Sequence, residues 1–243
     1  MSAERKVILI TGGAKGIGRA LSEAAASAGY AVVVNYRTSK EAAEELVAGI
    51  RSRGGESICV AGDVTLVEDV NRLVSTTLEN FGQIDCLINN AGVADIRAQA
   101  EADERHFDDM LRANVKTAFL MSQAVIVEMT KRAKGGRLVF LSSLATRTGG
   151  VVSPAYAASK AALEGLMHYY ATYLLSHRIT ANAIAPGLVE SDMTNGMQLP
   201  PLSQLPLGRL GRADEMWPAL RMILETEYMT GQTIHLSAGR YMT

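Results

Sequence analysis

The sequence predicts a single α/β domain in which helices cover both faces of a doubly wound, parallel β-sheet. Short apolar runs alternate along the chain with amphipathic stretches of helical period, which is the pattern of repeated strand-helix-strand units. The first apolar run leads through a glycine-rich turn directly into a helical stretch, as in a right-handed crossover. The chain has 243 residues, 48% of them hydrophobic, and no linker composition divides residues 1–243, so one core is expected.

Strand and helix alternate three times in the first half of the chain. The apolar runs are short and are bounded by glycine or polar residues, so each is expected to form a buried strand. The expected strands are 6–11, 31–35, 57–61 and 86–88, and the expected helices between them are 19–29, 41–53 and 66–81.

The second half of the chain completes a seven-stranded, Rossmann-like sheet. Its expected strands are 137–141, 180–185 and 232–236, and its expected helices are 103–132, 155–176 and 214–224. Asn114 lies within the first of these helices, where a satisfied core amide is the alternative to a functional group, and Asp214 is expected to cap the last. The irregular segment at about 188–205 is expected to form a short lid.

Composition and charge exclude several classes of function. The formal net charge is -1 and no basic block with interleaved aromatic residues occurs, so no binding to nucleic acid or to an anionic membrane is expected. Residues 1–6 are too polar for a signal peptide and no apolar run approaches the ~20 residues of a membrane span, so we expect a cytoplasmic protein. Cys59, Cys86 and the four histidines show no ligand spacing, so no metal site is expected.

A glycine-rich turn joins the first expected strand to its helix. Gly12, Gly16 and Gly18 give the spacing G-x-x-x-G-x-G, which differs from the G-x-G-x-x-G of many dinucleotide-binding turns. Glycines let backbone N–H groups approach a pyrophosphate, and the helix N-terminus adds partial positive charge. The turn is therefore interpreted as a phosphate-binding site, with a purely structural turn as the alternative. Asp63 and the turn 89–92 follow the third and fourth strands, where an adenosine and ribose would lie.

The end of the second strand predicts which nicotinamide cofactor binds. An acidic residue here hydrogen-bonds the ribose 2′-hydroxyl of NAD, whereas a basic residue accommodates the 2′-phosphate of NADP. The chain has Asn35 and Arg37 here, with Lys15 in the glycine turn, and no acidic residue before Glu41. We therefore predict NADP(H). The alternative is that Arg37 is a solvated surface residue.

A tyrosine and a lysine near the start of the helix 155–176 are candidate catalytic residues. Tyr156 and Lys160 are four residues apart, so their side chains share a helix face. A phenol has a pKa of ~10, and a neighbouring ammonium lowers that pKa, so Tyr156 is expected to transfer protons near neutral pH. Ser143 follows the strand 137–141 and is expected to hydrogen-bond a carbonyl oxygen at the carboxyl edge of the sheet.

The same spacing occurs a second time, in Tyr36 and Lys40, so the spacing alone does not identify a site. That second pair straddles a strand end and a helix start. Only Tyr156 combines an early position in a helix with an upstream serine at a strand tip, Ser143.

Several motifs follow one another along the chain. They are the turn 11–18, Asp63 with Val64, the turn 89–92, Asn114, Ser143, the segment 156–160 and Pro186 with Gly187. In residue type, order and spacing these motifs resemble one family, the short-chain dehydrogenases/reductases, over nearly the whole chain. The resemblance supports a catalytic role for Tyr156, which the spacing to Lys160 alone does not.

The resemblance implies a catalytic tetrad. In the family, Tyr156 would be the general acid for carbonyl reduction, and Lys160 would lower its pKa and hold the nicotinamide ribose. Ser143 would orient the carbonyl, and Asn114 would position a proton-relay water. The residues that the resemblance and the turn chemistry assign to NADP(H) are Gly12, Lys15, Gly16, Ile17, Gly18, Asn35, Arg37, Asp63, Val64, Asn90, Ala91, Gly92, Tyr156, Lys160, Pro186, Gly187 and Val189.

Within the family the chain is most similar to the 3-oxoacyl-[acyl-carrier-protein] reductases. The matching segments are 32–37, 185–194, 206–209 and 230–233. This resemblance implies NADPH-dependent reduction of a 3-oxoacyl thioester in fatty acid biosynthesis, with an acyl carrier protein as a potential partner, and a homotetramer built on the two long helices. Four features depart from the subfamily. Pro200 and Pro201 lie in a shortened segment before Pro206, and Ser191 stands where a threonine is usual. The basic surface residue before the sixth strand is shifted by one, to His177-Arg178, and the sequence 238–240 replaces a Gly-Gly turn with one that ends in Arg240.

Two alternative functions stay open from the sequence. The short lid favours a reductase or dehydrogenase of another small or cyclic carbonyl or alcohol. A non-catalytic NADP-binding regulator is the alternative from a different class, and the intact tetrad speaks against it.

Overall fold

Seven parallel strands form one sheet in the part of the chain that the structure, a computed structural model, describes: residues 5–191, 194 and 199–242. The strands are β1 (Val7–Ile10), β2 (Ala31–Tyr36), β3 (Ser57–Ala61), β4 (Cys86–Asn89), β5 (Gly136–Leu141), β6 (Ile179–Pro186) and β7 (Thr233–Leu236). Their order across the sheet is β3-β2-β1-β4-β5-β6-β7. The predicted seven-stranded parallel sheet is confirmed.

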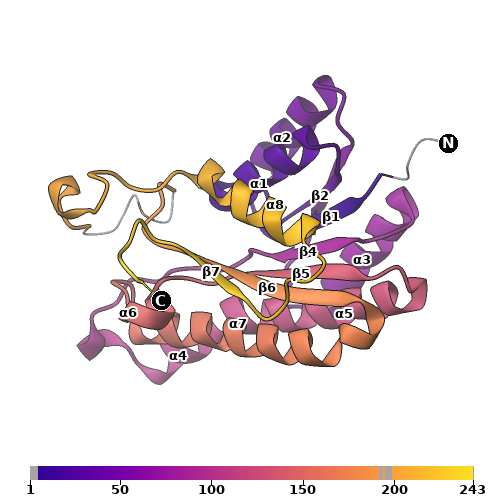
Figure 1. The fold of residues 1–243 in the computed structure, drawn as a ribbon. Coiled ribbons are helices and arrows are strands. Elements are labelled where there is room, and N and C mark those ends of the chain that lie inside the picture. The colour runs from indigo at the N-terminus through magenta and orange to yellow at the C-terminus, as the bar shows by residue number, and fades with distance from the viewer. Residues whose placement is uncertain (1–4, 192–193, 195–198, 243) are drawn as a thin grey trace.

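Helices cover both faces of this sheet, as Figure 1 shows. One face carries α1 (Gly16–Ser27), α2 (Lys40–Ser52) and α8 (Trp217–Glu225), and the other carries α3 (Val67–Phe81), α5 (Thr117–Arg132) and α7 (Pro154–Tyr173). The shorter segments are η1 (Gln99–Glu101), α4 (Glu104–Leu111), η2 (Arg112–Lys116), α6 (Ala145–Thr148), η3 (Leu175–His177), η4 (Leu202–Gln204) and η5 (Ala213–Met216).

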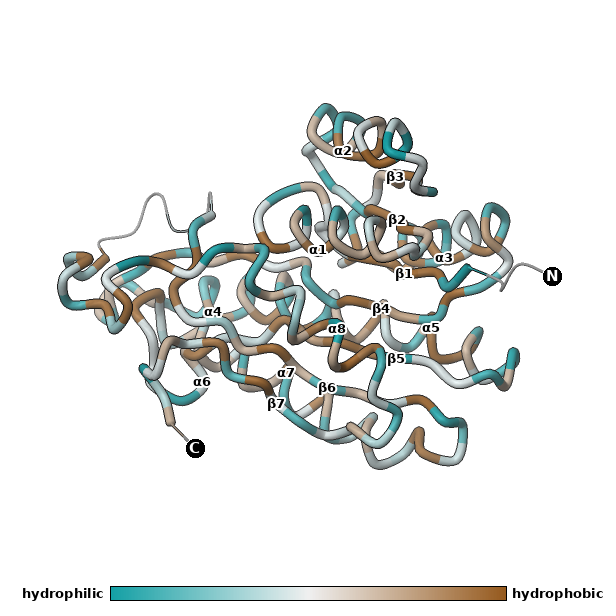
Figure 2. The backbone as a smooth tube through the Cα atoms, turned by 45° about the horizontal axis from the view of Figure 1, so that its top comes forward, coloured by the Kyte–Doolittle hydropathy of each residue, from teal (hydrophilic) through white to brown (hydrophobic). Residues whose placement is uncertain are grey.

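The central strands are hydrophobic on both faces. In β1 the side chains of Val7 and Leu9 pack in the core beneath α3, α5 and α7, while Ile8 and Ile10 pack in the core beneath α1, α2 and α8. All four are essentially inaccessible to water. Figure 2 shows the same contrast along the chain, with hydrophobic strands at the centre and hydrophilic segments outside. This burial explains why the strands are continuous apolar runs.

Three details differ from the sequence prediction. The helix expected at 103–132 is interrupted by a π-helical turn, η2, which contains Asn114. Asp214 does not cap the helix that ends near Leu224, because it lies inside the preceding turn η5; Arg212 is the N-cap, and its backbone N–H donates to Oε2 of Glu215 at 2.7 Å. The short helix α6 after Ser143 was not expected at all.

The segment expected as a lid, 188–205, is described only in part, because residues 192–193 and 195–198 lie outside the described residues. At its start, Val189 pairs with Gly211 in an isolated β-bridge. Near its end is the single 3-10 turn η4.

The sheet changes direction between β1 and β4. These strands are neighbours, although β2 and β3 lie between them in the sequence. The chain first extends the sheet to one side of β1 and then, from β4 onward, to the other side. Ligands of open parallel sheets bind outside the carboxyl ends of the strands at such a switch point. In Figure 1 this is the end of the sheet near α6 and the C-terminus.

Asp85 ties the opposite, amino-terminal end of the sheet together. Its Oδ2 accepts the backbone N–H of Val7 at 2.7 Å, and its Oδ1 accepts from the Arg132 guanidinium at 2.6 Å. Arg132, at the end of α5, also donates to Oε1 of Gln83 at 2.6 Å. The side chains of Asp85 and Arg132 are each only 17% exposed, so the pair is held largely away from water.

We expect Asp85→Asn to lower the free energy of unfolding by about 1.5–3 kcal/mol. The new NH2 group would face either the N–H of Val7 or the guanidinium of Arg132, both of which are donors, and the negative charge opposite Arg132 would be lost. Urea unfolding monitored by circular dichroism measures this loss. Asp109→Asn is the matched control, since the Arg105–Asp109 pair is exposed and 3.8 Å apart. Equal stability of the wild type and the Asp85 variant would contradict this account of the sheet end.

Candidate active site

The glycine turn between β1 and α1 packs directly against the turn that follows β4. Gly12 has a φ of +60°, a conformation that favours glycine. A Cβ on Gly18 would lie 2.5 Å from the carbonyl oxygen of Gly12 and 2.6 Å from Nδ2 of Asn90, so no side chain fits there. Glycine is therefore favoured at Gly12 by its backbone conformation and required at Gly18 by close packing.

Thr11 and Asn90 lock the ends of β1 and β4 together. The hydroxyl of Thr11 donates to the carbonyl of Ile88 at 3.3 Å and accepts the backbone N–H groups of Asn90 and Ala91, each at 3.0 Å. Nδ2 of Asn90 donates to the carbonyl oxygens of Thr11 and Gly12 at 2.9 and 3.0 Å. The two turns therefore form one rigid floor at the switch point of the sheet.

A first cleft of about 400 Å³ opens above this floor. The predicted cofactor residues that line it are Gly12, Lys15, Gly16, Ile17, Asn35, Arg37, Asp63, Val64, Asn90, Ala91 and Gly92. Gly18 does not line the cleft and lies behind it. Because α1 begins at Gly16, the partial positive charge of a helix N-terminus faces this cleft.

Asn35 supports the wall of the first cleft. Its Oδ1 accepts the N–H of Gly12 at 3.3 Å, and its Nδ2 donates to the carbonyl of Gly62 at 3.1 Å. The residue is buried, so its amide holds the glycine turn against the end of β3.

Arg37 stands at the edge of the first cleft, opposite Asp63. Its guanidinium NH1 lies 3.9 Å from Oδ2 of Asp63, and its side chain is 61% exposed. Burial raises the pKa of Asp63, but hydrogen bonds from Thr65 and the charge of Arg37 outweigh it, so the pKa is below its ordinary value. Asp63 is therefore ionised at neutral pH and holds Arg37 at the rim.

A second, smaller cleft of about 150 Å³ adjoins the first. Ser143, Tyr156, Lys160, Pro186, Gly187 and Val189 all line it. Ile17, Asn90 and Ser191 line both clefts, so a ligand that fills the first cleft can extend into the second. The sheet edge therefore brings the candidate cofactor and catalytic residues together.

Tyr156 lies in the first turn of α7. That turn is fixed by Ser153, whose hydroxyl accepts the N–H of Tyr156 at 3.1 Å, and by Pro154 at the helix start. Burial raises the pKa of Tyr156 above its ordinary value, and a hydrogen bond with the Ser143 hydroxyl only partly opposes the shift. The phenol is therefore protonated at neutral pH.

The expectation that Lys160 lowers the pKa of Tyr156 is wrong for this structure. Nζ of Lys160 lies 5.8 Å from the centroid of the Tyr156 ring and donates to the carbonyl of Leu141 at 2.9 Å. Burial lowers the pKa of Lys160 itself to about 8. Desolvation thus favours the neutral form of both groups.

Asn114 does not line either cleft within the described residues, but it contacts Val93, which lines the first cleft. Its Oδ1 accepts the N–H of Val93 at 2.7 Å, and its Nδ2 donates to the carbonyl of Val93 at 3.1 Å and to the Ser159 hydroxyl at 2.9 Å. The side chain predicted to position a water thus joins two segments of the chain. It places Ser159, the neighbour of Lys160.

Sequence reasoning missed Glu164, a buried carboxylate one helical turn beyond Lys160. It accepts hydrogen bonds from the Ser142 hydroxyl at 2.8 Å, the Thr146 hydroxyl at 3.1 Å and the Arg147 guanidinium at 3.2 Å. These contacts clamp α6 and the end of β5 around Ser143. The signal was present in the sequence, because Glu164 continues the four-residue spacing of Tyr156 and Lys160 on one helix face.

Across residues 5–191, 194 and 199–242, no cluster of three or more His, Cys, Asp or Glu side chains is arranged to hold a metal ion. None of the helices within those same ranges combines the length and hydropathy needed to cross a bilayer.

Comparison with known proteins gives consistent matches over the whole fold. The sequence model of the family described as short chain dehydrogenase matches residues 6–200. A 3-oxoacyl-[acyl-carrier-protein] reductase, FabG, of Staphylococcus epidermidis is 35% identical over 245 residues, covering 98% of this chain and 99% of the relative. A 3-oxoacyl-[acyl-carrier-protein] reductase of Synechocystis sp. is 36% identical over 241 residues, covering 98% of this chain and 97% of the relative. The solved structure of a doubly substituted short-chain dehydrogenase/reductase from Serratia marcescens superposes with a TM-score of 0.88 at 31% identity, covering 96% of this chain and 97% of that chain.

The buried Lys160 predicts a pH-dependent stability. Its pKa is about 8 in the folded chain, below the ordinary value of 10.5, so the folded form holds the proton less tightly. The resulting destabilisation is fully present below pH 8 and is relieved as the pH rises toward 10.5. Relative to Lys160→Met, we expect the wild type to gain on the order of 2–3 kcal/mol between pH 7.5 and 10.

Urea unfolding of both proteins at several pH values between 7 and 10 measures this difference. The Met variant keeps the volume of the side chain and removes the titration, so it cancels the contributions of all other groups. A stability difference that stays constant over this pH range would mean that Lys160 is not desolvated in the folded protein.

Proposed function

Because the chain belongs to the short-chain dehydrogenase family, we propose that it is an NADPH-dependent oxidoreductase that reduces a ketone to a secondary alcohol. The observation that carries this proposal is the position of Ser143, Tyr156 and Lys160 in a small cleft that adjoins a larger, glycine-floored cleft. The arrangement suits a dinucleotide in the larger cleft with its reactive end beside the three side chains.

The first cleft fits NADP(H) in its chemistry. Backbone N–H groups of the turn 11–18 and the N-terminus of α1 would face the pyrophosphate. Arg37 at the rim, with Lys15 on the same cleft wall, would bind the 2′-phosphate through charge-assisted hydrogen bonds. The nicotinamide, when bound, supplies the hydride. Pro186 and Val189 would pack beside its ring.

In this proposal Tyr156 donates the proton to the carbonyl oxygen. The raised pKa keeps the phenol protonated at neutral pH, which is the form that a general acid for reduction needs. Ser143 holds the carbonyl oxygen beside the phenol by hydrogen bonding, and the ammonium of Lys160 stabilises negative charge that develops there. Asn114 acts as a positioning residue through Ser159 and Val93.

We infer a 3-oxoacyl thioester as the substrate, on a small thiol or on an acyl carrier protein, by analogy with the two curated relatives. The segment 188–205 would serve as the short lid of the single domain. Apolar side chains on the two long helices support a homotetramer: Phe119 and Val127 on α5 and Tyr169 on α7 are between 41% and 56% exposed. A cytoplasmic location in fatty acid biosynthesis is part of the same proposal.

A second candidate is the reduction of another small ketone. It is favoured by Arg240, which lines the second cleft and places a positive charge where the subfamily resemblance led us to expect a Gly-Gly turn. A panel of ketones distinguishes the two candidates by whether a thioester is turned over.

We expect Tyr156→Phe to lower kcat for NADPH-dependent reduction of an acetoacetyl thioester by about 10²–10⁴-fold while NADPH still binds, because only the acidic proton is removed. Loss of NADPH absorbance measures the rate. Tyr228→Phe, a change at a fully exposed tyrosine, is the matched control. A loss smaller than tenfold in the Tyr156 variant would show that another group donates the proton.

We expect Arg37→Asp to reverse or abolish the preference for NADPH over NADH, because the new carboxylate repels the 2′-phosphate and hydrogen-bonds a 2′-hydroxyl. The ratio of kcat/KM for the two cofactors measures the change. Lys40→Asp makes a similar change of charge at an exposed residue outside the lining of the first cleft. An unchanged ratio in the Arg37 variant would refute the assignment of the 2′-phosphate site.

A further inference from the structure

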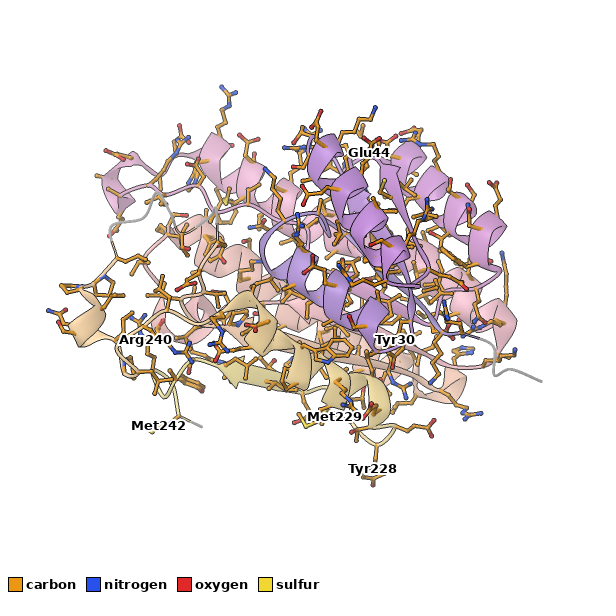
Figure 3. All side chains as sticks on the ribbon, turned by 90° about the horizontal axis from the view of Figure 1, so that it is seen from above. Tyr30, Glu44, Tyr228, Met229, Arg240 and Met242 are labelled. Atoms are coloured by element: carbon orange, nitrogen blue, oxygen red, sulfur yellow. The ribbon has the colours of Figure 1, made fainter. Side chains whose placement is uncertain are left out.

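The chain turns after β7 and brings one arginine to the second cleft. Ala238 adopts a left-handed conformation with a φ of 51°, and the N–H of Arg240 donates to the carbonyl of Ser237 at 3.1 Å. Ser237 packs closely on the cleft wall, since a Cβ on Gly187 would lie 3.2 Å from its Cα. Arg240 therefore lines the same cleft as Tyr156. In Figure 3 it lies at the end of the molecule reached by β7, away from Tyr228.

The described residues that line this cleft carry two positive charges and no carboxylate. The charged groups are Lys160 and Arg240. Lys160 is buried and donates to the carbonyl of Leu141. Arg240 is exposed, and its guanidinium has no hydrogen-bond or ion-pair partner within the part of the chain that the structure describes. A positive side chain at the wall of a reaction cleft, without a protein anion, is suited to an anionic ligand.

The neighbouring Arg147 does not share this property, because it already has partners. It donates to Oε2 of Glu164 at 3.2 Å, and its guanidinium carbon lies 6.0 Å from the centroid of the Tyr241 ring. Arg147 therefore serves the clamp around Ser143, while Arg240 is available to a ligand.

We propose that Arg240 determines substrate specificity by binding an anionic group, a carboxylate or a phosphate, that the ketone carries. This inference rests on the proposed function, since it concerns the substrate of the same cleft. A guanidinium offers two parallel N–H donors that match the oxygens of either anion, and such charge-assisted pairs are the strong hydrogen bonds of proteins. Arg240 acts away from the reacting carbonyl, so it contributes binding energy that is the same before and during the chemical step.

Two matched pairs of ketones test the proposal. The dimethyl ester of 3-oxohexanedioic acid is neutral, and its 1-methyl ester carries a carboxylate at carbon 6. Acetoacetyl pantetheine and acetoacetyl 4′-phosphopantetheine differ by one phosphate. We expect the wild type to prefer the charged member of at least one pair by about tenfold or more in kcat/KM, mainly through a lower KM. The pair that shows the preference identifies whether a carboxylate or a phosphate is bound.

The Arg240→Gln variant should still turn over the neutral ester and should lose most of the preference for the charged ester. Arg240→Lys should keep part of the preference, because it retains the charge but not the planar pair of donors. Arg221→Gln, which removes an exposed arginine on α8 outside the cleft, should leave the preference unchanged. Added salt should weaken the preference in the wild type, because Arg240 is exposed.

Reduction of the neutral ketones with no preference for either charged member would overturn the inference and leave the proposed function intact. A preference of the same size in Arg240→Gln would overturn it as well. Loss of oligomeric state in Arg240→Gln, together with loss of activity on the neutral ester, would place Arg240 in a subunit contact instead. Absence of turnover with every ketone would overturn the proposed function and this inference with it.

Discussion

The packing of the glycine turn against the turn 89–92 is the contact on which the rest of the site depends. A Cβ at Gly18 would collide with the side-chain amide of Asn90, and that amide in turn donates to the carbonyl of Gly12. The two turns end β1 and β4, the strands between which the sheet changes direction. Any shift of one turn would therefore widen or close the crevice into which both clefts open.

The buried side-chain amide of Asn114 connects the segment after the turn 89–92 to the helix that carries Lys160. Asn114 holds the backbone of Val93 with two hydrogen bonds and the hydroxyl of Ser159 with a third. The π-helical turn η2 contains this residue within an otherwise regular helix, and such insertions are frequent at functional sites. The side chain of Asn114 thus joins the loop after β4 to the first turns of α7, which carry Lys160.

The sequence predicted features that depend on local pattern and missed those that depend on tertiary proximity. The strand β1 and the glycine turn were predictable because burial on both faces demands an apolar run and close packing excludes a Cβ at Gly18. The cap at Asp214 was wrong because the carboxylate of Glu215, one residue later, takes the N–H of Arg212 instead. The spacing of Glu164 indicates the helix face on which it lies, but its three hydrogen-bond donors could not be identified from local pattern, since they lie 17 to 22 residues earlier in the chain.

The spacing of Tyr156 and Lys160 correctly placed both groups at one cleft, but it gave the wrong sign for the pKa of the phenol, because burial raises that pKa and only the hydrogen bond with Ser143 opposes the shift. The same burial lowers the pKa of Lys160 to about 8, close to physiological pH, so its charge is sensitive to what binds nearby. An anion held in this cleft would favour the protonated lysine and raise that pKa. By linkage, the protonated lysine would bind the anion more tightly. The charge of the substrate, the protonation of Lys160 and the positive charge of Arg240 would therefore influence one another through electrostatic interactions in this cleft.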